Sequence, residues 1–71
     1  MNTKVLKNFG NNLKRYRIAN GLTQEELAEK VNVHQTYIGK LELGMINPSL
    51  MRMFIITRAL KIKLSNLTDF D

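Results

Sequence analysis

The stretch TQEELAEKVNVHQTYIGKLE, residues 23–42, contains two short helical patterns that are interrupted at Asn32. Thr23 is followed three residues later by Glu26, which is the signature of a capping box at the start of a helix. Asparagine tolerates the left-handed backbone conformation that a sharp turn requires, so the interruption is expected to be a turn between two helices. The stretch therefore predicts a helix-turn-helix over about residues 23–43.

Apolar residues recur at helical spacing on both sides of this motif and predict three further helices. The first helix follows Thr3, a candidate N-cap, and stops at Asn20-Gly21. The fourth begins after Ser49, a second candidate N-cap, and a short fifth covers residues 65–70. We therefore expect an all-α fold, a compact five-helix bundle in which helices two and three form the motif.

The composition excludes several other classes of protein. A chain of 71 residues is expected to form one domain, over residues 1–71. It has no Cys and one His, so no disulfide and no metal site of the usual Cys/His kind is expected. No apolar run approaches the roughly 20 residues of a membrane span, and the N-terminus lacks the apolar core of a signal peptide, which favours a cytoplasmic protein. Paired carboxylates and activated nucleophiles are absent from the sequence pattern, so neither an enzyme nor a cofactor is expected.

The charge of the chain favours a polyanionic partner. Eleven Lys and Arg against six Asp and Glu give a net charge of +5. A solvated basic surface is the simpler explanation of such a balance, but the charges are unevenly distributed along the chain. The basic residues that precede every acidic residue are Lys4, Lys7, Lys14, Arg15 and Arg17. One end of the fold is therefore expected to be distinctly positive.

The segments LTQEELAEKV and YIGKLELGMINPSL, on either side of the turn, resemble the Cro/repressor-type helix-turn-helix family of bacterial and phage transcription regulators. The features that carry this resemblance are Thr23-Gln24, Leu27-Ala28, Ile38, Leu41-Glu42, Gly44 and Pro48. The longer stretch HQTYIGKLELGMINPSL is also similar to the controller proteins of restriction-modification systems, a subgroup of the family. The resemblance implies a lambda-repressor-like fold and binding to double-stranded DNA.

The resemblance implies that the third helix enters the major groove of DNA with its N-terminal residues. Gln35, Thr36 and Lys40 would then face base edges, and Gln24 would contact a backbone phosphate. The side chains suit this role, because Gln bonds adenine in bidentate fashion, Lys donates to guanine, and the Thr methyl group touches thymine. The alternative for Gln35 and Thr36 is that they are ordinary solvated residues at a helix start.

Several other residues are candidates for contacts with DNA phosphates. The predicted set is Gln24, Tyr37, Lys14, Arg15, His34 and Asn47. The alternative for Tyr37 is a ring that covers the edge of the core, and for Lys14 and Arg15 it is simple solvation. His34 either caps the third helix through a ring nitrogen or lies against a phosphate.

Two positions inside the resemblance concern structure more than recognition, and a third departs from the family pattern. The family pattern implies a partly buried salt bridge between Arg17 and Glu42, which joins the first helix to the third. Gly39 lies inside the third helix, where glycine is about 1 kcal/mol less favourable than alanine. It either lets the backbone approach DNA or is simply tolerated.

The C-terminal helices, at about residues 49–70, carry more apolar residues than one core-facing stripe requires. We expect two chains to pair through them around a two-fold axis, although all of these residues belonging to a single core is the alternative. The predicted interface consists of Phe54, Ile55, Leu64, Leu67 and Phe70.

The expected function is a sequence-specific transcriptional regulator that binds an inverted-repeat operator as a homodimer. It is expected to regulate its own operon through its concentration, with no small-molecule ligand and no membrane. The alternative is an antitoxin or another protein-interaction module that uses the same fold to bind a partner protein.

Overall fold

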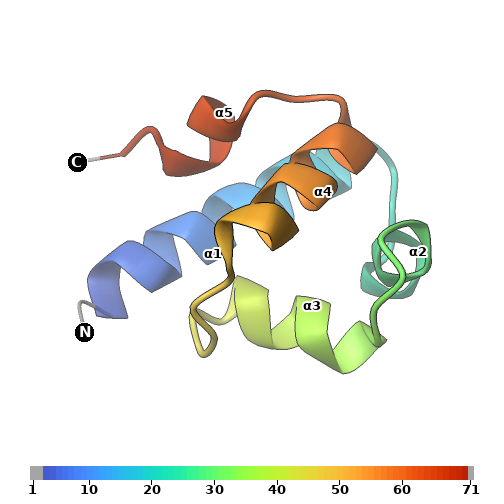
Figure 1. The fold of residues 1–71 in the computed structure, drawn as a ribbon, viewed down its shortest axis with the longest axis horizontal. Helices are drawn as coiled ribbons and strands as arrows, with labels where there is room; N and C mark the ends of the chain where they lie inside the picture. The colour runs from blue at the N-terminus through green and yellow to red at the C-terminus, as the bar shows by residue number, and fades with distance from the viewer. Residues whose placement is uncertain (1–2, 71) are drawn as a thin grey trace.

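The computed structural model describes residues 3–70, which form helices joined by short turns and contain no strand (Figure 1). The helices are α1 (Thr3–Ala19), α2 (Gln24–Lys30), α3 (Gln35–Glu42), α4 (Leu50–Leu60) and α5 (Leu64–Thr68). In Figure 1, α1 runs through the middle of the bundle, and it packs against both α3 and α5. The predicted all-α fold with five helices is confirmed. None of the helices within residues 3–70 is long and apolar enough to cross a membrane.

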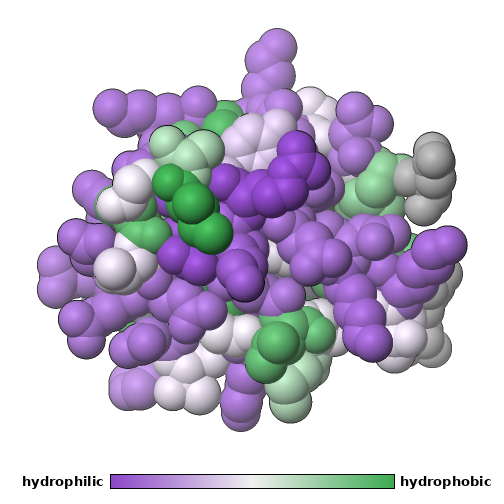
Figure 2. Space-filling view, turned by 180° about the vertical axis from the view of Figure 1, so that it is seen from behind, coloured by the Kyte–Doolittle hydropathy of each residue, from purple (hydrophilic) through white to green (hydrophobic). Residues whose placement is uncertain are grey.

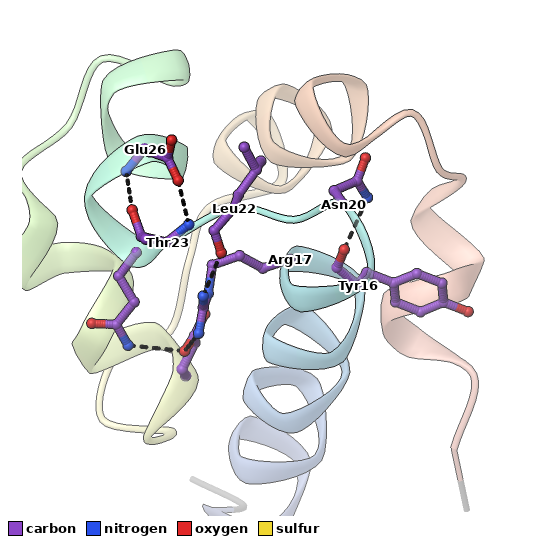
Figure 3. A network of polar contacts seen from close by, with 8 residues as sticks. Tyr16, Arg17, Asn20, Leu22, Thr23 and Glu26 are labelled. Carbon is purple, nitrogen blue, oxygen red and sulfur yellow. Dashed lines mark hydrogen bonds and ion pairs between the residues drawn. The ribbon is translucent and has the colours of Figure 1, made fainter.

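The start of α2 is fixed by the predicted capping box. Thr23 Oγ1 accepts a hydrogen bond from the Glu26 backbone N–H at 3.0 Å, and Glu26 Oε1 accepts one from the Thr23 N–H at 2.9 Å (Figure 3). The Thr23 backbone N–H, and then its hydroxyl, hold the pKa of Glu26 below its ordinary value. This contribution to stability is therefore present above the ordinary carboxyl pKa and is lost as pH falls through the lowered one.

Replacement of Thr23 with alanine is expected to lower the free energy of unfolding by about 1 kcal/mol, because a helix N-cap is lost. The measurement is urea denaturation followed by circular dichroism. Thr23→Ser, which keeps the hydroxyl, serves as the matched control and is expected to stay close to the wild type. Equal stability of Thr23→Ala and the wild type would show that the Thr23 hydroxyl contributes nothing to the cap.

Of the other helix ends predicted from the sequence, some are confirmed and some differ. Ser49 caps α4, since its Oγ accepts from the Arg52 backbone N–H at 3.1 Å. Thr3 lies within α1, so its prediction as the N-cap is wrong. The fifth helix spans Leu64–Thr68 instead of residues 65–70, and it ends before Phe70.

The turn between α2 and α3 has the predicted conformation, because Asn32 has a φ of 58°.

The packing of α1 on α3 depends on a glycine that the sequence pattern did not reveal. A Cβ atom at Gly10 would collide with the carbonyl oxygens of Leu41 and Glu42. Only glycine therefore lets the backbones of α1 and α3 approach this closely.

The core is formed by apolar residues from all five helices and by Val31, which directly follows α2. Its fully or almost fully buried members are Phe9, Leu13, Leu27, Ala28, Val31, Ile38, Leu41, Ile56, Leu60 and Leu67. Leu67, predicted for a dimer interface, has an exposed fraction of 0% within a single chain. That prediction is wrong, because α5 closes the bundle over α1 and uses Leu67 to do so.

Candidate nucleic-acid interface

Helix α3 presents one face to the core and the opposite face to solvent. Ile38 and Leu41 are fully buried, whereas the predicted base-contacting residues Gln35, Thr36 and Lys40 are exposed. The outer side of α3 therefore carries polar side chains that can bond to base edges, while its inner side is packed against the core.

His34 caps the start of α3. Its Nδ1 accepts a hydrogen bond from the Thr36 backbone N–H at 3.1 Å, so the first of the two alternatives for this residue is present. His34 also lines an open hollow on the turn side of the motif, together with Glu25 and Glu29 of α2. Its contact with a phosphate stays a prediction.

A buried polar network joins α1, α2 and α3 behind the exposed face. Arg17 Nε donates to Glu42 Oε2 at 2.6 Å, and Arg17 Nη2 donates to Oε1 at 3.2 Å. The other terminal nitrogen of Arg17 donates to the Leu22 carbonyl at 2.7 Å (Figure 3). The ion pair expected from the family resemblance is thus present, and both of its residues are buried.

Gln24 belongs to the same network, which the sequence did not predict. Its Nε2 donates to Glu42 Oε1 at 2.9 Å, so the carboxylate accepts bonds from both α1 and α2. The amide of Gln24 is therefore held in one orientation at the edge of the exposed face of α3. Its predicted role at a phosphate stays compatible with this geometry, because Nε2 carries a second hydrogen.

Two adjoining surface hollows connect the predicted contact residues. The first is lined by Gln24, Gln35, Thr36, Gly39, Lys40 and Leu43. The second is lined by Asn11, Lys14, Gln24, Gly39, Glu42 and Leu43. The structure thus brings the three predicted base contacts together with Gln24, and it places Lys14 beside them. Asn11 was missed, although it precedes Lys14 by one helical turn and shares its face.

Besides His34, three predicted phosphate contacts lie away from these hollows. Arg15 Nη1 donates to Asn12 Oδ1 at 3.3 Å, and Arg15 lines neither hollow. Asn47 lines a separate, mainly apolar hollow that includes residues of α1 and the C-terminal segment. Tyr37 is half-buried against the core, and the Arg52 guanidinium lies 5.7 Å from the centroid of its ring. The core-covering alternative for Tyr37 is therefore the one that the geometry favours.

Comparisons with known proteins identify the family to which this arrangement belongs. The model of the helix-turn-helix family matches residues 13–67, which include the motif, the polar network and most of the core. The chain belongs to the helix-turn-helix family. The resemblance expected from the sequence is thereby confirmed.

Relatives within the helix-turn-helix family are transcriptional regulators. An uncharacterised HTH-type transcriptional regulator of Archaeoglobus fulgidus is 41% identical over 59 residues, which cover 83% of this chain and 84% of that protein. Control protein C.SmaI of Serratia marcescens is 39% identical over 56 residues, covering 79% and 67% respectively. The crystal structure of the restriction-modification controller protein C.AhdI from Aeromonas hydrophila superposes with a TM-score of 0.87 at 35% identity, over 92% of this chain and 94% of that one. This helix-turn-helix protein is therefore a transcriptional regulator with a DNA-binding fold.

The outward face of α4 in this helix-turn-helix protein is unusually apolar. Its large exposed residues are Leu50, Met51, Phe54 and Ile55, with exposed fractions of 57%, 68%, 46% and 37%. Leu64 and Phe70 are half-buried, and Phe70 packs against the core. Seen from behind, by contrast, the molecule presents a mainly hydrophilic surface with small, separate hydrophobic patches (Figure 2).

Proposed function

We propose that this transcriptional regulator acts as a homodimer that binds an inverted-repeat operator in a sequence-specific way. The observation that carries the proposal is the exposed face of α3, where Gln35, Thr36 and Lys40 surround a hollow that also contains Gln24. Gln35 would read an adenine through a bidentate bond, and Lys40 would donate to a guanine. The net charge of +5 supports attraction to the phosphate backbone of DNA.

The dimer is proposed to form through the outward face of α4. One recognition helix reads only a few base pairs, whereas specific binding needs more discrimination than one helix supplies. A second copy of the chain, related by a two-fold axis, would cover the exposed apolar residues and place the two recognition helices about 34 Å apart. The proposed interface contains Leu50, Met51, Phe54 and Ile55, the first two of which were not expected from the sequence.

Control by concentration follows from such a dimer. At low concentration the chains would be monomers with weak affinity, and accumulation would produce dimers that occupy the operator. The named relatives support this reading, because one is a control protein and another is a restriction-modification controller protein. We therefore propose that the chain regulates the operon that encodes it.

The experiment that tests the proposal is selection of bound duplexes from a random DNA pool at about 150 mM salt, an ionic strength at which non-specific binding is weak. Enrichment of an inverted repeat is the expected result. Persistent sequence-blind binding would contradict the proposal. Co-purification of a stoichiometric second protein, bound to α4 in place of another copy, would favour the protein-interaction alternative.

Substitution of Phe54 by Asp is expected to weaken self-association about tenfold or more, because the charge would be buried in the proposed interface. Sedimentation equilibrium measures the monomer–dimer dissociation constant directly. Ser65→Asp adds the same charge at the exposed start of α5 and is the matched control. An unchanged dissociation constant for Phe54→Asp would remove this face from the interface.

A further inference from the structure

The cap of α3 is a group whose charge depends on pH. His34 is the N-cap residue, and its Nδ1 accepts a hydrogen bond from the Thr36 backbone N–H at 3.1 Å. The caps of α2 and α4 are the hydroxyl oxygens of Thr23 and Ser49, which can accept at any physiological pH. An imidazole nitrogen accepts only while it carries no proton. The hydrogen bond at the start of α3 therefore requires the neutral form of His34.

This cap responds to pH in a range where few other groups do. Imidazole side chains gain their charge between about pH 5 and pH 8. His34 is the only histidine of the chain, so no second imidazole contributes. Carboxylic acids titrate roughly two pH units lower than imidazoles. A change from about pH 8 to about pH 5.5 therefore acts mainly on the cap of α3.

The groups that face His34 determine where its charged form is attracted. Among the described residues that line the hollow beside it, the charged ones are Glu25 and Glu29 of α2. On α3 itself the charged residues are Lys40 and Glu42, which lie more than one turn further along and outside this hollow. An imidazolium is attracted to carboxylates and repelled by the positive N-terminal end of a helix. A protonated His34 is thus drawn from the start of α3 toward α2.

Loss of this cap would affect the part of α3 that is proposed to read bases. Gln35 and Thr36 follow His34 directly in the first turn, and both are exposed. A helix start that loses its N-cap is destabilised, and its side chains are then no longer held in one direction. The buried Ile38 and Leu41, by contrast, still hold the remainder of α3 against the core. Protonation therefore loosens the first turn of α3 without unfolding the protein.

We propose that His34 is a pH-sensitive switch on sequence recognition, which orders the first turn of α3 as a neutral cap and releases that turn when it becomes a cation facing α2. The inference rests on the proposed function, because it assumes that this turn reads bases. A cation close to DNA also strengthens the attraction to phosphates, which does not depend on base sequence. This attraction cancels in the ratio of the affinities for operator and scrambled DNA. The switch is therefore a loss of discrimination at low pH.

The test measures this ratio at about pH 8 and about pH 5.5, at constant ionic strength, with the duplex selected from the random pool. The wild type is expected to discriminate about tenfold less at the lower pH, because an N-cap is lost in both half-sites. His34→Ser is the matched variant, since serine is a preferred N-cap and its hydroxyl does not titrate in this range. The ratio for His34→Ser is expected to be equal at the two pH values.

A second variant tests the role of α2 in the switch. Glu25→Gln combined with Glu29→Gln removes the carboxylates that attract the charged imidazole. The loss of discrimination is then expected to begin at a lower pH than in the wild type. A pH response identical to that of the wild type would overturn the part of the proposal that involves α2.

A further measurement needs no DNA. In amide NMR spectra of the free protein, the Thr36 resonance is expected to shift with the same midpoint as the His34 ring, because its acceptor is lost on protonation. A Thr36 amide that does not follow the ring would overturn the switch. So would a wild-type ratio independent of pH, or a ratio that falls equally in His34→Ser. These results leave the proposed function intact, whereas failure of the wild type to prefer any duplex at either pH would overturn both.

Discussion

Replacing Glu42 with alanine is expected to lower the free energy of unfolding by about 3–5 kcal/mol, because it leaves the buried Arg17 guanidinium without its counter-charge. Gln24 would lose its acceptor at the same time. A domain of this length has a total stability of only about 4–10 kcal/mol, so at the lower end of this range much of the protein would be unfolded. Loss of DNA binding by this variant would reflect the missing fold rather than a missing contact with DNA.

Urea denaturation followed by circular dichroism measures this effect, and a double variant provides the control. Arg17→Met combined with Glu42→Leu removes both charges and replaces them with apolar groups of similar size. It is expected to be more stable than Glu42→Ala, because no charge is left buried and unpaired. A Glu42→Ala variant within about 0.5 kcal/mol of the wild type would mean that the network is solvated and structurally unimportant.

Replacing Gln35 with alanine is expected to leave the fold intact and to reduce discrimination between DNA sequences. Its side chain is exposed, so the free energy of unfolding should change little. A bidentate contact with a base contributes about 1–3 kcal/mol of discrimination, and a dimer would lose it in both half-sites, giving about 2–6 kcal/mol in total. The quantity to measure is the ratio of the dissociation constants for scrambled and operator DNA.

Lys14→Ala is the matched control, because Lys14 is exposed on the same side but belongs to the second hollow. It is expected to weaken binding to operator and scrambled DNA alike and to reduce the salt dependence by about two phosphate contacts, one in each half-site. A loss of affinity by Gln35→Ala that was equal on both DNAs would place Gln35 at a phosphate and contradict its role in base recognition.

The elements that sequence predicted correctly depend on neighbouring residues. The capping box of Thr23 and Glu26, the left-handed Asn32 and the cap at Ser49 each involve groups only a few positions apart. The collision that requires Gly10 involves carbonyl groups more than 30 positions away, at Leu41 and Glu42. No local pattern distinguishes such a glycine from one in an ordinary turn.

The dimer surface was predicted only in part, for a related reason. Apolar residues at helical spacing are the signal for a core and for an interface alike. The residues next to Leu67 and Phe54 in the sequence do not show which of the two is buried. In the structure, Leu67 is fully buried and Phe54 is 46% exposed. The direction in which α5 packs on α1 decides between them, and that direction depends on the whole fold.

In the candidate site, too, some features follow from a local sequence pattern and others depend on how the helices pack. The resemblance to the family placed Gln35, Thr36 and Lys40 on one helix face, and a helical period is sufficient to bring them together. The bond between Gln24 and Glu42 links two helices, so it emerges only when they are packed.

The central claim, that α3 recognises DNA sequence when two chains form a dimer, is tested most directly by the ratio of the affinities for selected and scrambled duplexes. At about 150 mM salt, the wild type is predicted to bind the selected inverted repeat about a thousandfold or more tightly than scrambled DNA. A ratio close to one, with affinity for both DNAs falling steeply as salt rises, would contradict the claim.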